Sequence, residues 1–272
     1  GISIQLGYAY TPLPDGQILG FIDVPGHERL VHTMVAGATG IDFGLLIVAA
    51  DDGVMPQTRE HLAVLQLLGL QAGAIVLSKA DRADATRIES VKAELQALVQ
   101  GSFLDNAPIF VVDALSADKP GLEALRQHLH AQAMQATKQD GQGYFRLAID
   151  RVFTLQGHGT VVTGTVHDGV LDLDGPAMDL RLMPRGTPVR ARSIHAQNQA
   201  SRQARAGQRC ALNLGGIDVQ DIERGDWLAD ARCFIPSTRI DVELSLLDKD
   251  IPALRTWSPW HVHMGAAHLT AH

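Results

Sequence analysis

The sequence predicts an open α/β domain with a mainly parallel sheet, followed by an all-β barrel and the beginning of a second β domain. Two observations lead to this prediction. In the first half, short apolar runs rich in β-branched residues alternate with segments of helical period, which is the pattern of β-α-β units. In the second half, strand-like runs are separated by glycine-containing turns, and no helical period of useful length occurs.

In the α/β half, the predicted strands are short, mostly apolar runs, and the predicted helices carry apolar stripes that suit core packing. We expect strands at residues 18–23, 45–50, 74–78 and 109–112. The helical stripes fall at residues 62–68, 88–99 and 122–129, the first of them behind Pro56, a favourable early-helix residue. Ligands of such sheets bind at the carboxyl ends of the strands, so functional residues are expected there.

The β half begins after a polar, glycine-containing stretch at residues 138–143, which suits a linker. Its strands are expected at residues 144–153, 160–166, 178–182, 189–193 and 209–214. A third β-type stretch begins near residue 237, where Ile240, Val242, Leu244 and Leu246 alternate with polar residues. We therefore expect an α/β domain at residues 1–137, a barrel at residues 144–236, and the N-terminal part of another barrel at residues 237–272.

Composition narrows the functional class. The 272 residues are 46% hydrophobic, but the longest apolar stretch is far too short to span a membrane, and no signal peptide is recognisable. The two cysteines lie far apart and match neither a zinc pattern nor a disulfide framework. A reducing, cytoplasmic setting fits best, without a membrane partner.

Charge is distributed unevenly along the chain, whose net charge is −7. Residues 1–143 hold 9 Lys and Arg against 16 Asp and Glu, whereas residues 144–272 hold 14 of each class. Between Arg181 and Arg209 there are seven arginines and no acidic residue. Such a run is either a solvated sheet face or a surface that contacts phosphate, because arginine binds phosphate through two hydrogen bonds.

Residues that could bind a ligand or take part in catalysis follow the first predicted strand of the α/β half. Asp23 at its end can hold a magnesium ion through water. Gly26 lets a main-chain N–H approach a phosphate without an intervening Cβ, and His27 follows at the mouth of the site. The alternative is an ordinary strand-to-helix turn capped by Asp23.

Two further motifs follow later strands in the same half. In SKAD, at residues 78–81, the carboxylate of Asp81 can accept two hydrogen bonds from guanine, a pattern that adenine does not offer, while the stem of Lys79 lies along the base. The main chain of Asp113-Ala114-Leu115 is placed to contact the guanine carbonyl. Each motif alone is also explained by a polar turn, but three of them in order, each closing a predicted strand, favour a nucleotide site.

These motifs resemble those of the translational GTPases. DVPGHE resembles the family's switch II, SKAD its guanine-specificity motif NKxD, DAL stands where the family has SAL, and GISI at the start resembles the end of switch I. Longer stretches, among them DDGVMPQTREHL, FRLAIDRVF and WSPWHVHMGAAH, are similar to the bacterial selenocysteine-specific elongation factors. The resemblance covers essentially the whole chain. It implies an α/β P-loop-type GTPase domain, here without its N-terminal strand, P-loop and first helix, then a translation-factor barrel and the start of a second barrel.

The resemblance also implies roles for individual residues, with GTP and Mg²⁺ as cofactors. Ser3 and, through water, Asp23 would ligate magnesium, and His27 would position the attacking water. Ser78 replaces the usual Asn, a departure that bears on nucleotide affinity rather than on guanine preference. The implied GTP contacts are Asp23, Val24, Pro25, Gly26, Ser78, Lys79, Asp81, Asp113, Ala114 and Leu115.

A second implied site lies in the barrel. Asp150, Arg151 and Arg209 match family positions proposed to line a pocket for the selenocysteyl group. A selenol is more acidic than a thiol, and a neighbouring arginine favours the resulting anion. The alternative is that Asp150 and Arg151 form a surface ion pair of little energetic value.

As a whole, the resemblance implies a GTP-hydrolysing elongation factor that delivers selenocysteyl-tRNA to the ribosome at UGA codons. Its messenger RNA hairpin would be read by C-terminal domains outside this chain. Since no GxxxxGK[ST] occurs in the 272 residues, we expect this chain by itself to be defective in GTP binding and inactive as a GTPase. Two alternatives stay open: part of a general translational GTPase for another aminoacyl- or initiator tRNA, and a non-enzymatic RNA-binding β module.

Overall fold

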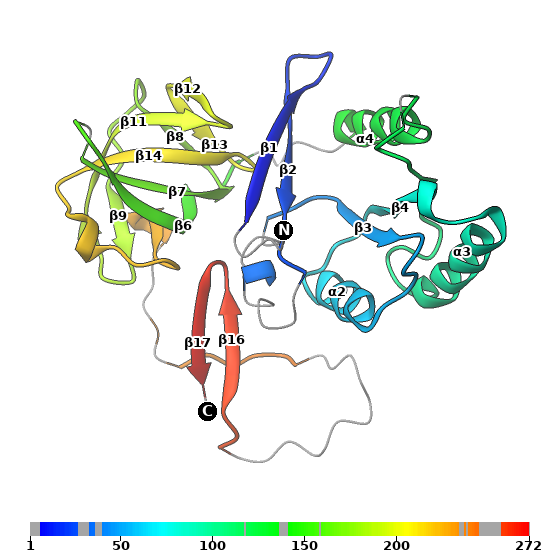
Figure 1. Cartoon of the computed structure of the whole chain (residues 1–272). Coiled ribbons are helices and arrows are strands. Elements are labelled where there is room, and N and C mark those ends of the chain that lie inside the picture. Colours follow the sequence, from blue (N-terminus) through cyan, green and yellow to red (C-terminus); the bar gives the residue numbers. More distant parts are fainter. Residues whose placement is uncertain are drawn as a thin grey trace. The chain divides into compact units, whose positions relative to one another are not determined.

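The computed structural model describes residues 6–26, 33–35, 40–116, 118–135, 141–157, 159–233, 237, 239–244 and 257–271. The chain divides into two compact units, the first formed by residues 1–34 and 41–137 and the second by residues 35–40 and 138–272 (Figure 1). Each unit has its own sheets and its own hydrophobic core. The predicted start of a third domain falls within the second unit. Among the described residues, no helix is both long and apolar enough to cross a membrane.

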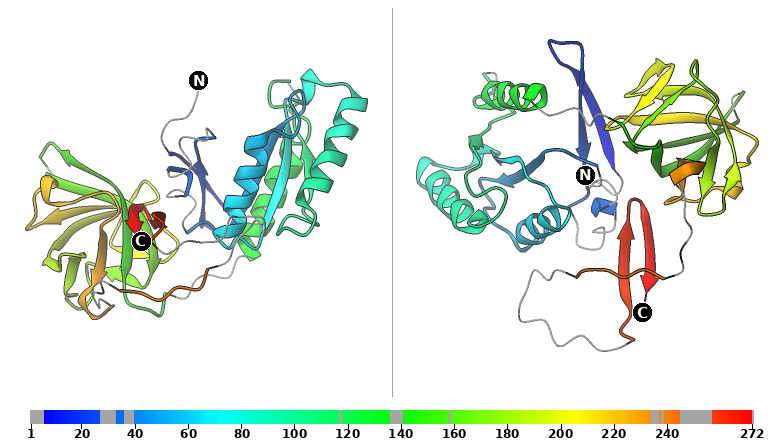
Figure 2. Two further views of the ribbon diagram at one scale, coloured as in Figure 1. Left: turned by 90° about the horizontal axis from the view of Figure 1, so that it is seen from below. Right: turned by 180° about the vertical axis from the view of Figure 1, so that it is seen from behind.

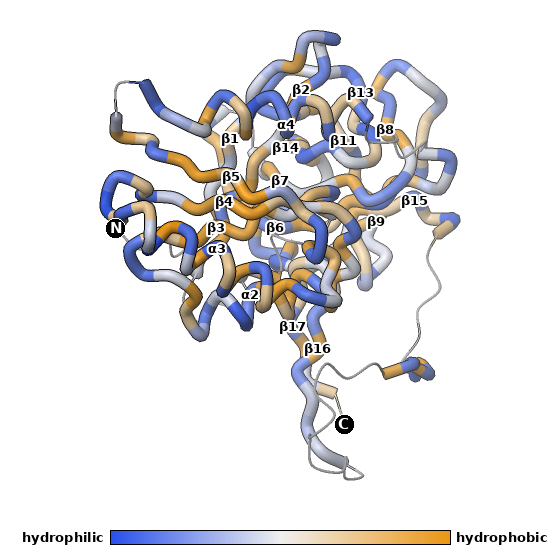
Figure 3. The backbone as a smooth tube through the Cα atoms, turned by 90° about the vertical axis from the view of Figure 1, so that its right-hand side faces the viewer, coloured by the Kyte–Doolittle hydropathy of each residue, from blue (hydrophilic) through white to orange (hydrophobic). Residues whose placement is uncertain are grey.

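The first unit contains the predicted parallel sheet. Its strands are β3 (Gly44–Ala49), β4 (Gly73–Ser78) and β5 (Ile109–Val111), in the order β3-β4-β5. β4 is the central strand, and its residues Ala74 to Leu77 are at most 5% exposed, as a strand covered on both faces requires. Figure 3 shows the hydrophobic residues running along these three strands.

Helices cover both faces of this sheet (Figure 1). Residues of α2 (Pro56–Leu67) and α3 (Ala85–Val99) pack with Ile75 and Leu77 on one face. Leu125 of α4 (Leu122–Gln135) packs with Val76 on the other. Local sequence sets the helix starts: Pro56 occupies the first turn of α2, and Asp84 caps α3 by accepting a hydrogen bond from the Arg87 amide at 2.7 Å.

The run Ile18–Asp23 does form a strand, β2, but its expected place in the parallel sheet is wrong. It pairs antiparallel with β1 (Gly7–Pro12), a strand that the sequence analysis missed. A Pro-Asp-Gly turn joins the two strands, with Gly16 at φ 83° and the Leu13 amide donating to the Gln17 carbonyl at 2.7 Å. Both strands are only partly buried, so the pattern is that of a hairpin rather than of a strand covered on both faces.

The second unit contains a curved antiparallel sheet of eight strands in the order β10-β9-β15-β6-β7-β14-β11-β12, which confirms the predicted translation-factor barrel type (Figures 1 and 2). A short ribbon of β8 (Val170–Asp172) and β13 (Gln203–Arg205) accompanies it. The core is formed by inward-facing residues of the long strands, including Leu147, Val162 and Leu212, which are fully buried. The eight strands are β6 (Arg146–Leu155), β7 (Gly159–Asp168), β9 (Leu180–Met183), β10 (Thr187–Pro188), β11 (Arg190–Ala196), β12 (Gln199–Ser201), β14 (Arg209–Gly215) and β15 (Trp227–Asp230).

The strand expected around Ile240 is not present in the described residues. Residues 239–244 have no strand assignment, and Ile240 and Val242 are 76% and 72% exposed. Alternation supplies an apolar face, but no neighbouring strand among the described residues pairs with it. Instead, β16 (Trp260–Met264) and β17 (Ala267–Ala271) form a hairpin whose turn residue Gly265 lies close to Trp227 of β15.

Candidate functional site

The loops that follow β3, β4 and β5 meet at one edge of the parallel sheet. Backbone hydrogen bonds tie them together: the Ala50 amide donates to the Ser78 carbonyl at 2.8 Å, and the Ala80 amide donates to the Val112 carbonyl at 3.3 Å. This is the carboxyl edge, where open α/β sheets bind their ligands. The SKAD loop and the Asp113 loop therefore lie next to each other, as the sequence predicts.

In the SKAD loop, the backbone and the charges have a defined arrangement. Lys79 has a left-handed backbone (φ 53°, ψ 41°), and the short 3₁₀ turn Ala80–Arg82 follows it. The Lys79 ammonium lies 3.7 Å from Asp51 and 3.6 Å from Asp52, both in the loop after β3. The Ser78 hydroxyl donates to the Val48 carbonyl of β3 at 3.3 Å, while Asp81 is exposed to solvent.

Two acidic residues at this edge were not singled out from the sequence. Asp51 and Asp52 belong to the quoted DDG stretch, yet the sequence analysis gave them no role. In the structure they face Lys79, and Asp51 also lies 3.7 Å from Arg82. Their position directly after an apolar strand is the signal that would have identified them.

The Asp113 loop is a tight polar turn. The Asp113 carboxylate accepts hydrogen bonds from the amides of Leu115 at 2.9 Å and Ser116 at 3.1 Å, and these bonds lower the pKa of Asp113 below its usual range. The Leu115 amide is thus already engaged within the loop, and its side chain is 79% exposed. Behind the turn, Gly121 has φ 74°, and the Val111 carbonyl lies where a side chain at 121 would begin.

The DVPGHE segment is described only as far as Gly26. Asp23 ends β2 with an exposed side chain, Pro25 is buried, and Gly26 is exposed. Ser3 and His27 lie outside the described residues, so their predicted roles stay predictions.

The structure adds one residue to this segment that sequence reasoning missed. His61 of α2 lies against Gly26: its ring carbon Cε1 is 3.4 Å from where a Gly26 Cβ would stand, and the Gly26 backbone raises the pKa of His61. In the sequence His61 directly precedes the helical stripe at residues 62–68, and nothing local distinguishes it from an ordinary helix residue. Its contact with Gly26 makes it a positioning residue for this loop.

We expect His61 to titrate below its ordinary value of 6.5, because burial lowers its pKa more than Glu60 and the Gly26 backbone raise it. The unfolded chain then binds more protons near that pH, so the stability that His61 contributes is present above pH 6.5 and is lost as the pH falls. An NMR titration of the imidazole Cε1–H resonance measures this. The variant Glu60→Gln should lower the pKa of His61 further, and a rise in that variant would contradict the assignment of causes.

Asp150, one of the three barrel residues predicted as a site, does not belong to an exposed surface ion pair, which was the alternative considered for Asp150 and Arg151. Asp150 pairs with Arg209 across the sheet: the Arg209 guanidinium donates to the two carboxylate oxygens at 3.1 and 2.9 Å. Thr163 completes the group, since its hydroxyl donates to Asp150 at 2.6 Å and accepts from Arg209 at 3.0 Å. The side chains of Asp150 and Arg209 are only 10% and 17% exposed.

A β-bulge explains this geometry. The register of β6 against β7 shifts between Ile149 and Arg151, so Asp150 is the extra residue at the bulge. Arg151 comes next on β6, opposite Thr163 in the register, and is exposed. Thr163 was missed from the sequence because its position beside Asp150 depends on the pairing of two strands.

Comparisons with known proteins agree with this geometry. Residues 1–157 match the family of the elongation factor Tu GTP-binding domain, and residues 159–229 match elongation factor Tu domain 2. The chain belongs to the elongation factor Tu GTP-binding domain family. The α/β unit, which carries the SKAD and Asp113 loops, therefore corresponds to the GTP-binding domain of this family, and the barrel with its Asp150–Arg209 pair corresponds to domain 2.

The chain is also similar over its whole length to individual curated elongation factors. It is 43% identical over 271 residues to a selenocysteine-specific elongation factor of Desulfomicrobium baculatum, covering 100% of the chain and 42% of that protein. It is 44% identical over 273 residues to the selenocysteine-specific elongation factor of Escherichia coli K12, covering 99% of the chain and 42% of that protein. The chain thus spans less than half the length of these curated relatives.

Solved structures give the same result. A bacterial selenocysteine-specific elongation factor, EF-Sec, superposes with a TM-score of 0.86 at 28% identity, covering 99% of this chain and 44% of that one. The elongation factor SelB of Methanococcus maripaludis, solved with the GTP analogue GppNHp, superposes with a TM-score of 0.77 at 27% identity, covering 85% of this chain and 50% of that one.

Proposed function

We propose that this chain is part of an elongation factor that binds GTP, delivers selenocysteyl-tRNA to the ribosome at UGA codons and hydrolyses GTP in doing so. The observation that carries the proposal is the 43–44% identity to selenocysteine-specific elongation factors, which extends through both units. A resemblance confined to the α/β unit would support only a GTPase.

The residues at the sheet edge fit a guanine nucleotide. Asp81 is exposed in the 3₁₀ turn that follows the left-handed Lys79, so its carboxylate lies outside the sheet and is able to accept from the guanine N1–H and amine. Asp23 at the end of β2 would hold a magnesium ion through water, and Gly26 would offer its amide to a phosphate. Bound magnesium would supply positive charge against the phosphates. The His61 ring packs against Gly26 and would help to keep its backbone in place.

In the barrel, we propose that Asp150, Arg151 and Arg209 form the aminoacyl pocket. The bidentate bond to Asp150 fixes the orientation of the Arg209 guanidinium, and Thr163 adds a third contact. Arg151 contributes a second positive charge at the same bulge. Together with the Asp150 carboxylate, the two arginines leave one net positive charge, which favours a selenolate over the neutral hydroxyl of a seryl group.

The test is a chimera in which this chain replaces the matched region of the Escherichia coli relative, 42% of that protein. We expect the chimera to bind GTP in preference to ATP and to restore UGA read-through in cells that lack their own factor. The 272-residue chain alone is expected to show no saturable binding of GTP at micromolar concentration, because it contains no GxxxxGK[ST] motif.

Two variants of the chimera separate the parts of the proposal. Asp81→Asn should weaken GTP binding and favour xanthosine triphosphate, whose carbonyl can accept from an amide. Replacing Arg151 and Arg209 by alanine should weaken the binding of selenocysteyl-tRNA selectively, much more than that of seryl-tRNA. Equal loss of both ligands would indicate a factor for another aminoacyl-tRNA, and saturable GTP binding without any response to Asp81→Asn would refute the guanine assignment.

A further inference from the structure

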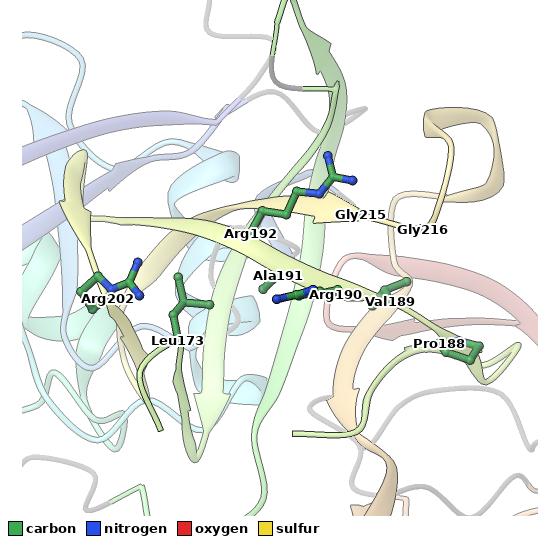
Figure 4. Close-up of a pocket in the computed structure, with 9 residues that line it drawn as sticks. All are labelled: Leu173, Pro188, Val189, Arg190, Ala191, Arg192, Arg202, Gly215 and Gly216. Carbon is green, nitrogen blue, oxygen red and sulfur yellow. The ribbon is translucent and has the colours of Figure 1, made fainter. Parts of the chain in front are cut away.

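Three histidines lie on one face of the β16–β17 hairpin, and none of them belongs to the proposed GTP or aminoacyl site. His263 stands opposite His268 in the register, and His261 is two positions before His263 on the same strand, so all three side chains point to the same side of the hairpin. Val262 and Leu269, which are also opposite each other, point to the other side. The arginine-lined pocket of the barrel (Figure 4) is built from other strands and does not include these histidines.

The rings of this histidine cluster (His261, His263 and His268) lie close together. The Nδ1 atom of His261 and the Nε2 atom of His268 are 2.9 Å apart, and the centroids of these two rings are 4.9 Å apart. The His263 ring stacks on the His268 ring, with centroids 4.7 Å apart and an angle of 11° between the planes. All three residues are exposed. The cluster is therefore a group of nitrogen ligands that an ion can reach from solvent.

The distance between the two facing nitrogens matches that between two ligands of one metal ion. Imidazole nitrogens bind such ions at about 2.0–2.1 Å, so two of them stand about 2.9 Å apart at a right angle and about 3.3 Å apart at the tetrahedral angle. The 2.9 Å between His261 and His268 fits the right angle. This angle is typical of octahedral and square-planar ions, and imidazole suits Ni²⁺ and Cu²⁺ among them. In the described residues no group of three or more ligating side chains could hold a metal ion, so water would complete the coordination.

We propose that His261 and His268 together bind a divalent transition-metal ion, Ni²⁺ or Cu²⁺ rather than Zn²⁺, and thereby link β16 to β17. Without an ion, the same two nitrogens share a hydrogen bond in which one ring donates and the other accepts. When the ion binds, the donating ring carries its proton on its other nitrogen, and both rings rotate to direct a lone pair at the metal. The site differs from the proposed magnesium site, because Mg²⁺ prefers oxygen ligands.

Binding of this ion acts on the hairpin itself. A hairpin of two strands has little stability of its own, and an ion held by one residue of each strand requires the strands to be paired. The free energy of metal binding is therefore added to the stability of the paired state. The hairpin contacts the barrel around its turn, where Ala267 lies against Gly225 and Gly265 lies close to Trp227. We expect the ion to keep the hairpin closed at this contact.

The test is a calorimetric titration of the 272-residue chain with Ni²⁺ in a buffer that does not bind metal. His261→Asn and His268→Asn should each weaken binding at least about tenfold, the loss that follows removal of even an outer-shell partner of a metal ligand. His263→Asn keeps both ligating nitrogens and should weaken binding less than either of them. The control His195→Asn removes an exposed imidazole of β11 and should change the affinity less than about twofold, because no ligand is lost.

NMR of the unsubstituted chain identifies the ligands without any substitution. With Zn²⁺ as a diamagnetic probe, we expect shifts of the nitrogen resonances of His261 Nδ1 and His268 Nε2 and slower amide exchange in β16 and β17, whereas Mg²⁺ should change neither. The proposal is overturned if Ni²⁺ does not bind saturably, which would leave a hydrogen bond as the only role of the pair. It is also overturned if His195→Asn or His263→Asn weakens Ni²⁺ binding as much as His261→Asn does.

Discussion

Replacing Asp150 by alanine is expected to lower the free energy of unfolding by about 3 kcal/mol. The carboxylate is 10% exposed and holds Arg209, itself 17% exposed, through two hydrogen bonds. Removing Asp150 leaves the largely desolvated Arg209 charge without this carboxylate, and Thr163 loses an acceptor at the same time. Urea denaturation followed by tryptophan fluorescence measures the change, since Trp227 lies in the same sheet.

The matched controls separate pairing from truncation. Asp174→Ala breaks a comparable bidentate pair with Arg202, but both of those side chains are more than 60% exposed, so the midpoint should stay nearly unchanged. The double variant Asp150→Ala, Arg209→Ala should lose less than the sum of the two single changes, because no unpaired charge remains. Additive losses in the double variant would show that the pair itself does not carry the effect.

Replacing Gly121 by alanine is expected to destabilise the α/β unit by about 2 to 4 kcal/mol. Gly121 has φ 74°, which disfavours any side chain, and its Cβ would stand 1.9 Å from the Val111 carbonyl oxygen at the end of β5. The segment must shift, and with it the hydrogen bond from the Asp113 amide to the Pro120 carbonyl. We therefore expect changed NMR shifts for the amides of Leu115 and Ser116 as well as a lower unfolding midpoint.

The control for this variant is Gly101→Ala. Gly101 has almost the same backbone angle, φ 75°, but no atom lies within 4 Å of its Cβ position. It should lose only the conformational part, about 1 kcal/mol, with no change at the Asp113 loop. Equal losses at both glycines would show that the close approach to Val111 has no energetic consequence.

Much of the architecture could be predicted from the sequence, and so could the position of the SKAD and Asp113 loops at the carboxyl edge of the parallel sheet. In β4, apolar residues on both faces are followed directly by Ser78 and Lys79, and this order alone places the polar residues at the carboxyl edge of a parallel sheet. The same reasoning wrongly placed Ile18–Asp23 in the parallel sheet, because an apolar run contains no information on which strand it pairs with. It failed again near Ile240, where alternation is present without a pairing partner in the described residues.

The sequence by itself determined the order of the elements and the loops that carry polar residues, since both follow from local periodicity and turn chemistry. Tertiary structure alone decided which groups meet. Asp150 and Arg209 are separated by 59 positions, and Arg202 and Asp174 by 28, so an arginine segment without acids in its own sequence is largely paired in space. The contact of His61 with Gly26 depends likewise on packing. The physical reason is that side-chain pairing is set by distance in three dimensions, which local composition does not encode.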